Sequence, residues 1–208
     1  MKEKLNITKG NTFLSFFLIP IIVGITFGIL TVWGQRILPG HWNSLANLGS
    51  VWLVPAFFVG SFSLSKRIAM ISSTVSLFGM VLGYYGYAII IQNVAHSIYF
   101  ISAWTVCSVV GGVIFGIAGF LWRDTVNPYH KFGSALISGV FITDGLHMML
   151  NFTDYSHMLS VAYTEIIVGI VFIIILERSY ENRRSSFLTV VPITILGLIG
   201  YGILSKFT

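Results

Sequence analysis

Charged residues are scarce in this sequence. They make up only 9% of its 208 residues, whereas hydrophobic residues make up 55%. An average soluble domain carries about 25% charged residues, because charged side chains cover much of its surface. The scarcity of charge therefore excludes a soluble enzyme, a nucleic-acid-binding protein and a disordered chain. It indicates an integral membrane protein whose main surroundings are the lipid bilayer.

Cysteine is almost absent as well. The only one, Cys107, cannot form a disulfide within the chain and lies inside an apolar segment, where a small core residue is the ordinary interpretation. No spacing of Cys and His resembles a zinc site, and the chain contains no H-E-x-x-H motif. We therefore expect neither a bound metal nor another cofactor.

Long apolar runs make up most of the chain. A membrane-spanning helix needs about 20 mainly apolar residues, and seven segments qualify. They are Thr12–Trp33, Asn47–Leu64, Arg67–Ile91, Tyr99–Trp122, Phe132–Phe152, Met158–Leu176 and Phe187–Leu204. All connections between them are short. The sequence therefore predicts an all-α integral membrane bundle that forms a single domain over residues 1–208.

The basic residues predict how this bundle is oriented. Lys and Arg number 12, and all but two of them precede the first segment or join segments two and three, four and five, and six and seven. Only Arg36 and Lys206 lie on the other side. Membrane proteins keep Lys and Arg in their cytoplasmic loops, so we expect a cytoplasmic N-terminus and an external C-terminus. The net charge of +5 then needs no nucleic-acid partner.

Glycine pairs with the spacing G-x-x-x-G occur in three of the segments. They are Gly24 with Gly28, Gly79 with Gly83, and Gly112 with Gly116. Such pairs place small residues on one helix face and let two backbones approach closely. The faces could pack within one chain, or they could form a homodimer or bind a partner in a membrane complex.

An internal repeat is a further hypothesis. Residues 24–29 resemble residues 112–117, and the same offset carries the first three segments onto the next three. Triplets of helices related in this way have opposite orientations, which is typical of many secondary transporters. The pattern indicates a 3+3 inverted repeat plus one helix, with chance similarity between glycine-rich helices as the alternative.

Two acids lie within the predicted spans, Asp144 and Glu165, and His147 shares a helix face with the first of them. A charge at the bilayer centre costs at least about 2.5–3.5 kcal/mol, so such residues usually face the bundle interior. Each acid lies roughly 10–12 Å below the outer boundary, counted along its helix from the turn that joins the two segments. They could therefore share one buried site.

A shared site of this kind would suit proton coupling, or binding of a cationic or polyhydroxyl ligand. The tyrosines Tyr84 and Tyr85 and the loop over residues 34–47 would then lie near its outer mouth. The side chains of Asp144, His147 and Glu165 also have ligand types that a metal accepts, although no metal motif is present. No residue is predicted to be catalytic.

Alternatively, the acids lock helices together by hydrogen bonds. Thr143, Tyr163 and Thr164 are the candidate partners for this role. Two charged pairs at the other end of the bundle, Glu177 with Arg178 and Glu181 with Arg184, are expected to be solvated.

Several stretches taken together resemble a known group of sequences. They are residues 39–47 with Trp52, residues 83–85, Trp104 with residues 111–119, and Trp122 with Arg123. This set is similar to an uncharacterised bacterial family of multi-pass membrane proteins, classed only as a domain of unknown function. The resemblance covers the first through the sixth segment. It implies a bacterial cytoplasmic membrane location and brings no activity, cofactor or functional residue.

Three functions are compatible with these features. The first is a transporter of a small molecule or ion, or the substrate-binding membrane subunit of one. The second is an accessory, scaffold or immunity-type membrane protein, in which the glycine faces bind a partner. The third is an intramembrane lipid-modifying enzyme, which the sequence favours least because the two acids lie nearer the outside than such enzymes usually place them.

Overall fold

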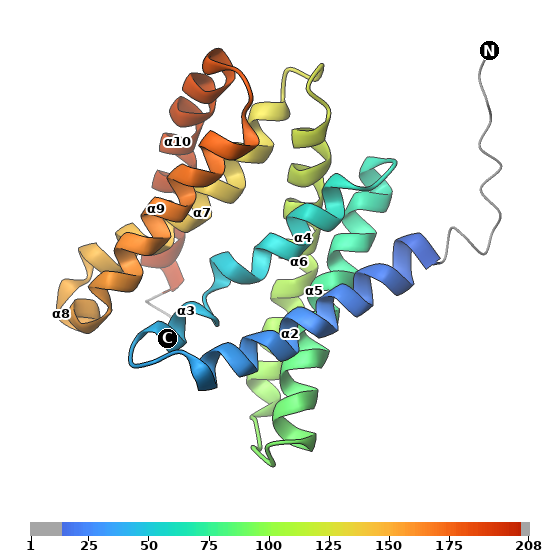
Figure 1. The fold of residues 1–208 in the computed structure, drawn as a ribbon, viewed down its shortest axis with the longest axis vertical. Coiled ribbons are helices and arrows are strands. Elements are labelled where there is room, and N and C mark those ends of the chain that lie inside the picture. The colour runs from blue at the N-terminus through green and yellow to red at the C-terminus, as the bar shows by residue number, and fades with distance from the viewer. Residues whose placement is uncertain (1–13, 205–208) are drawn as a thin grey trace.

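The computed structural model describes residues 14–204, and helices dominate this part of the chain (Figure 1). Seven of its helical stretches are long and apolar enough to cross a membrane. They are Phe16–Ile37, Trp42–Ser61, Lys66–Ile90, Ile98–Arg123, His130–Leu150, Phe152–Leu176 and Tyr180–Ile203. The predicted all-helical architecture, with seven helices that are long and apolar enough to span a membrane, is confirmed, and it indicates a multi-pass membrane protein. Thr12, where the first segment was expected to begin, lies outside the described residues.

The helices follow one another with short connections. In chain order they are the π-helical turn η1 (Leu14–Leu18), α2 (Ile19–Ile37), α3 (Trp42–Leu45), α4 (Gly49–Ser61), α5 (Lys66–Ile90), α6 (Ile98–Arg123), α7 (His130–Leu150), α8 (Phe152–Tyr155), the 3-10 turn η2 (Ser156–Met158), α9 (Leu159–Leu176) and α10 (Tyr180–Leu204). The last helix begins seven residues before the expected Phe187. The Ser179 hydroxyl accepts a hydrogen bond from the Asn182 N–H at 3.1 Å, and this bond caps a polar first turn that the apolar run alone does not reveal.

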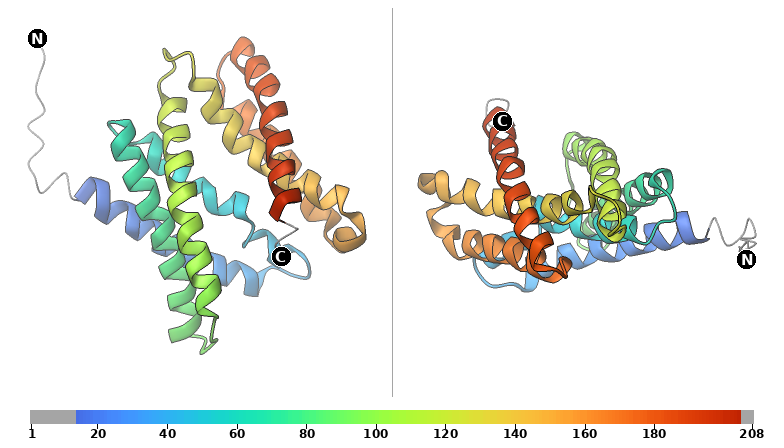
Figure 2. Two further views of the ribbon diagram at one scale, coloured as in Figure 1. Left: turned by 180° about the vertical axis from the view of Figure 1, so that it is seen from behind. Right: turned by 90° about the horizontal axis from the view of Figure 1, so that it is seen from above.

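Successive long helices alternate in direction, so the connections gather at two ends of the bundle (Figures 1 and 2). The connections over residues 62–65, 124–129 and 177–179 form what we call the basic end, because Lys and Arg cluster in and beside them. The connections over residues 38–48, 91–97 and 151–158 form the opposite end. This arrangement agrees with the grouping of Lys and Arg in the sequence.

Helices α2, α4, α5 and α6 form a glycine-packed unit. The glycines of all three G-x-x-x-G pairs lie against the backbone of a neighbouring helix, where a Cβ atom would overlap main-chain atoms. Gly24 and Gly28 of α2 face α5, whereas Gly79 and Gly83 of α5 face back towards α2. Gly112 of α6 lies against Thr74 of α5. The faces therefore serve packing within the chain, the first of the two expected uses.

Helices α7, α9 and α10 form a second unit, which we call the acid-bearing unit. Here α7 packs against both α9 and α10, and it joins the glycine-packed unit mainly through α6 (Figure 2). The hypothesis of an inverted repeat gains no support from these pairings. Helix α2 packs extensively on α5, whereas the helices that would correspond to them, α6 and α9, do not form a comparable pair.

Candidate functional site

Asp144 of α7 and Glu165 of α9 meet at the start of α4. Both are buried, with exposed fractions of 3% and 0%. Ser50 bridges them: its backbone N–H donates to Asp144 Oδ2 at 3.3 Å, and its hydroxyl donates to Glu165 Oε2 at 2.8 Å. The first turn of a helix has unpaired N–H groups and a partial positive charge, which favours carboxylates at this place. The structure thus brings together the two acids that the sequence singled out.

Tyr201 of α10 completes the contacts of Asp144. Its hydroxyl donates a hydrogen bond to Asp144 Oδ1. The imidazole of His147 stacks on the Tyr201 ring, with 4.2 Å between the ring centroids and 14° between the planes. His147 Nδ1 lies 3.2 Å from Asn151 Nδ2. His147 thus lies beside the site, against the tyrosine that donates to Asp144.

The acid pair has no basic partner of its own. Among residues 14–204, no Lys or Arg forms an ion pair with Asp144 or Glu165, and Glu165 Oε1 is buried without any hydrogen-bond partner. Burying an ionised carboxylate without a counter-charge costs several kcal/mol. Within the described residues, nothing but a proton or a bound cation could therefore offset the charge of the pair.

A cavity of about 400 Å³ adjoins Asp144 and Tyr201 between α6, α7 and α10. Six apolar side chains contribute to its lining: Ile114, Phe115, Leu136, Val140, Ile193 and Leu196. The remaining lining residues are Asp144, Tyr201, Thr143 and Gly197. The cavity is open at the surface, because Leu196 and Ile114 of its lining are 68% and 45% exposed.

Two apolar clusters lie in the acid-bearing unit. Towards the opposite end, Met148, Met158, Val161 and Ala162 pack together, and Leu45 and Leu48 of the preceding loop cover them. Towards the basic end, the second cluster consists of Ala135, Ile173 and Val190, with Ile142 and Ile193 against it. Leu45, from the segment expected near the outer mouth, thus packs on the acid-bearing unit, and the cavity lies on the α6–α10 side.

The other predicted site residues lie elsewhere. Tyr84 and Tyr85 contact each other and His96, with 6.0 and 5.0 Å from their ring centroids to that of His96, and neither bonds to the acids. Tyr84 instead lines a separate cavity of about 560 Å³ that includes Arg36. The structure therefore does not place the two tyrosines in the acid site.

The expected helix-locking partners do not donate hydrogen bonds to the acids either. The Thr143 hydroxyl donates to the Gly139 carbonyl at 2.6 Å and that of Thr164 to the Ser160 carbonyl at 2.9 Å, while Tyr163 is 53% exposed. Within residues 14–204, no three His, Cys, Asp or Glu side chains gather in a way that could hold a metal. The actual partners, Ser50 and Tyr201, were not predicted from the sequence.

The sequence matches the family model of DUF6518, a family of unknown function, over residues 7–207. The chain belongs to the DUF6518 family. This membership confirms the resemblance to an uncharacterised family. No curated protein and no solved structure matches the chain. The function of this DUF6518 member therefore has to be argued from its own residues.

A further buried acid of this DUF6518 member lies at the basic end. Glu177, which was expected to be solvated beside Arg178, is only 2% exposed. That expectation is wrong because Ser134 and Ser186 enclose the carboxylate and donate hydrogen bonds to it at 2.5 and 3.2 Å. Arg178 is exposed, as are both members of the other pair, Glu181 and Arg184.

Proposed function

We propose that this DUF6518 member is a small transporter of a bacterial cytoplasmic membrane that exchanges a proton for an apolar cation. One observation carries the proposal. Glu165 is completely buried beside Asp144, one of its oxygens has no partner, and no Lys or Arg of the described chain pairs with either acid. The ligand supplies the positive charge that the two carboxylates lack.

Coupling follows from competition for the same carboxylates. When the cation is absent, a proton on the acid pair removes the cost of a buried charge. When the cation binds, its charge takes over this role and the proton leaves. Ser50 and Tyr201 keep the carboxylates in place in both states, because they donate hydrogen bonds to fixed oxygen atoms.

The cavity beside Asp144 supports an apolar cation as the substrate. Its lining offers six apolar side chains but few polar groups, so a polyhydroxyl ligand would lose most of its hydrogen bonds with water. An apolar cation can place its hydrocarbon part against Ile114, Leu136 and Leu196 and its charge near Asp144. The position of the cavity between α6 and α10 favours entry from the lipid side.

The scaffold alternative has less support in this fold. It relied on glycine faces that could bind another helix, and those faces lie against helices of the same chain. Transport is therefore the function that the arrangement of side chains favours.

Binding and transport of ethidium, a flat apolar cation, test the proposal. The purified protein in detergent should bind ethidium, and binding should weaken as the pH falls because protons compete. Asp144→Asn and Glu165→Gln should each weaken binding by at least about tenfold, which corresponds to 1.4 kcal/mol. In liposomes with an acidic interior, the wild type should accumulate ethidium above the level of protein-free liposomes.

A lipid-facing tyrosine provides the matched control. Tyr163 lies on α9 two positions before Glu165 but is 53% exposed, so Tyr163→Phe should bind and transport like the wild type. If the wild type bound ethidium no better than the two acid variants, the proposed function would be wrong.

A further inference from the structure

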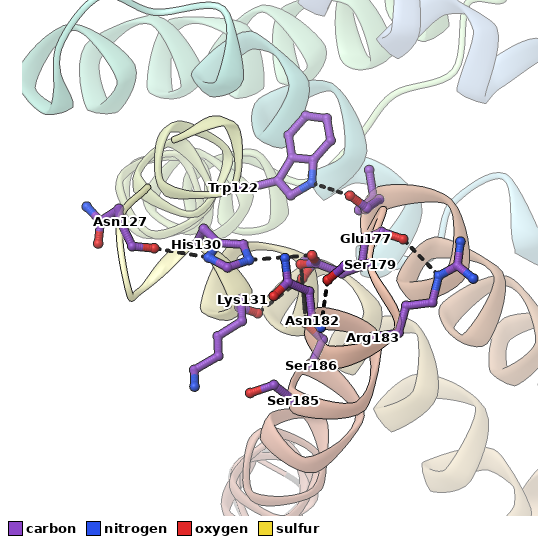
Figure 3. A network of polar contacts seen from close by, with 12 residues as sticks. Trp122, Asn127, His130, Lys131, Glu177, Ser179, Asn182, Arg183, Ser185 and Ser186 are labelled. Atoms are coloured by element: carbon purple, nitrogen blue, oxygen red, sulfur yellow. Dashed lines mark hydrogen bonds and ion pairs between the residues drawn. The ribbon is translucent and has the colours of Figure 1, made fainter. Parts of the chain in front are cut away.

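A second polar cluster lies at the basic end of the acid-bearing unit (Figure 3). Its centre is the carboxylate of Glu177, the residue that directly follows α9. Glu177 Oε1 accepts hydrogen bonds from the hydroxyls of Ser134 on α7 and Ser186 on α10. His130 Nε2 lies 3.5 Å from Glu177 Oε2. The cluster thus joins a carboxylate and an imidazole, two groups that can each carry a proton.

Several other charged groups surround this cluster. Arg183 Nε on α10 donates to the backbone carbonyl of Glu177 at 2.8 Å, which leaves the carboxylate to the serines and His130. Arg123 of α6 and Arg178 line a cavity of about 260 Å³ together with His130 and Glu177. Because Arg178 is exposed, this cavity reaches the surface at the basic end.

The two acid sites are built on the same three helices. The acid pair takes Asp144 from α7, Glu165 from α9 and Tyr201 from α10. The basic-end cluster takes Ser134 from α7, Glu177 from the residue that follows α9, and Ser186 from α10. Glu165 and Glu177 are 12 positions apart along the chain, a distance of about 18 Å at the rise of a helix.

Two buried hydroxyls without a partner lie between these sites. Ser138 Oγ on α7 and Thr194 Oγ1 on α10 make no hydrogen bond, although their residues are only 0% and 7% exposed. Buried hydroxyls that lack a protein partner are usually satisfied by water. Along α7, Ser138 lies about 6 Å from Ser134 and about 9 Å from Asp144. The hydroxyls therefore provide water-binding positions on α7 and α10, at places along these helices between the two acid sites.

We propose that Glu177, with His130, is a second proton site, and that protons pass between it and the acid pair along Ser138 and Thr194. In each transfer, the O–H bond of the protonated carboxyl in the acid pair breaks. An O–H bond forms at the Glu177 carboxylate, and the hydroxyls and water between them each accept and release one proton. The negative charge moves the other way, and His130 exchanges the proton with water at the basic end. This inference rests on the proposed function.

Ethidium separates the two proposals, because binding depends on the acid pair and transport depends on both sites. Glu177→Gln should bind ethidium as the wild type does, but it should slow ethidium accumulation driven by a pH gradient by about tenfold or more. Glu177→Asp should recover part of the rate. Glu181→Gln is the matched control, because Glu181 is an exposed glutamate four positions further along.

Ser138→Ala and Thr194→Val test the path between the sites without changing a charge. Each should slow transport and leave ethidium affinity unchanged, whereas Ser160→Ala, at an exposed serine of α9, should change neither. Transport at the wild-type rate in Glu177→Gln, or in both hydroxyl variants, would overturn the inference and leave the proposed function intact. If the wild type itself did not bind ethidium, both the proposed function and this inference would be overturned.

Discussion

The two units of this protein are stabilised in different ways. In the glycine-packed unit, α2, α4, α5 and α6 approach so closely that glycines touch the main chain of the neighbouring helix. In the acid-bearing unit, α7, α9 and α10 enclose all three buried carboxylates of the described residues: Asp144, Glu165 and Glu177. Close backbone packing is a source of stability, whereas the burial of Asp144 and Glu165 without a Lys or Arg partner in the described residues is a cost that a functional site would explain. We therefore assign the proposed function to the second unit.

Substitutions at two glycines of α5 should give the largest difference in stability. A Cβ atom on Gly83 would overlap the backbone of Ile25, whereas Gly86 has no atom within 4 Å of such a Cβ. Gly83→Ala should therefore lower the free energy of unfolding by about 1–3 kcal/mol. Gly86→Ala should leave it unchanged or raise it by up to about 1 kcal/mol, because alanine favours helices. Thermal unfolding in detergent measures both, and equal effects would contradict the packing account.

A substitution at Tyr201 tests the acid-bearing unit through ligand affinity, whereas the glycine substitutions test the other unit through stability. Tyr201→Phe removes the hydroxyl that donates to Asp144 but keeps the ring that stacks on His147. We expect ethidium affinity to fall by a factor that corresponds to about 1 kcal/mol, the typical contribution of one hydrogen bond. Titration of ethidium fluorescence measures this change relative to Tyr163→Phe. An unchanged affinity would mean that Tyr201 does not position Asp144 for binding.

Two serines on α5 give the smallest expected difference. The Ser73 hydroxyl donates to the Ala56 carbonyl at 2.6 Å, whereas Ser76 Oγ is buried without a partner. Ser73→Ala should lower stability by about 1 kcal/mol, while Ser76→Ala should be neutral or slightly stabilising. Chemical or thermal unfolding of the two variants side by side measures this. A larger loss for Ser76→Ala would show that its hydroxyl has a structural partner.

Much of the fold could be predicted from the sequence. Apolar runs long enough to cross a bilayer gave the seven helices, and the distribution of Lys and Arg agrees with the two ends of the bundle. The acid pair could be predicted too, because ionisable residues are rare in such helices and both acids lie at similar depth. The predicted depth depends only on the helical rise and on the turn that joins α7 and α9.

The partners of the acids could not be predicted in the same way. Ser50 lies 94 positions before Asp144, and Tyr201 lies 57 positions after it. Serine and tyrosine are common in membrane helices, so neither stands out until the packing of α4 and α10 on α7 is known. Glu177 was misjudged for the same reason, because the serines that bury it come from two other helices.

Proton release on ethidium binding tests the central claim most directly. The purified protein in a weakly buffered detergent solution is mixed with ethidium, and a soluble pH dye reports the protons set free. If the acid pair exchanges a proton for a cation, the wild type releases protons, and Glu165→Gln releases fewer while retaining the wild-type unfolding temperature. If the wild type releases none and Glu165→Gln unfolds at a much lower temperature, the acids lock the helices together and the protein is not the proposed transporter.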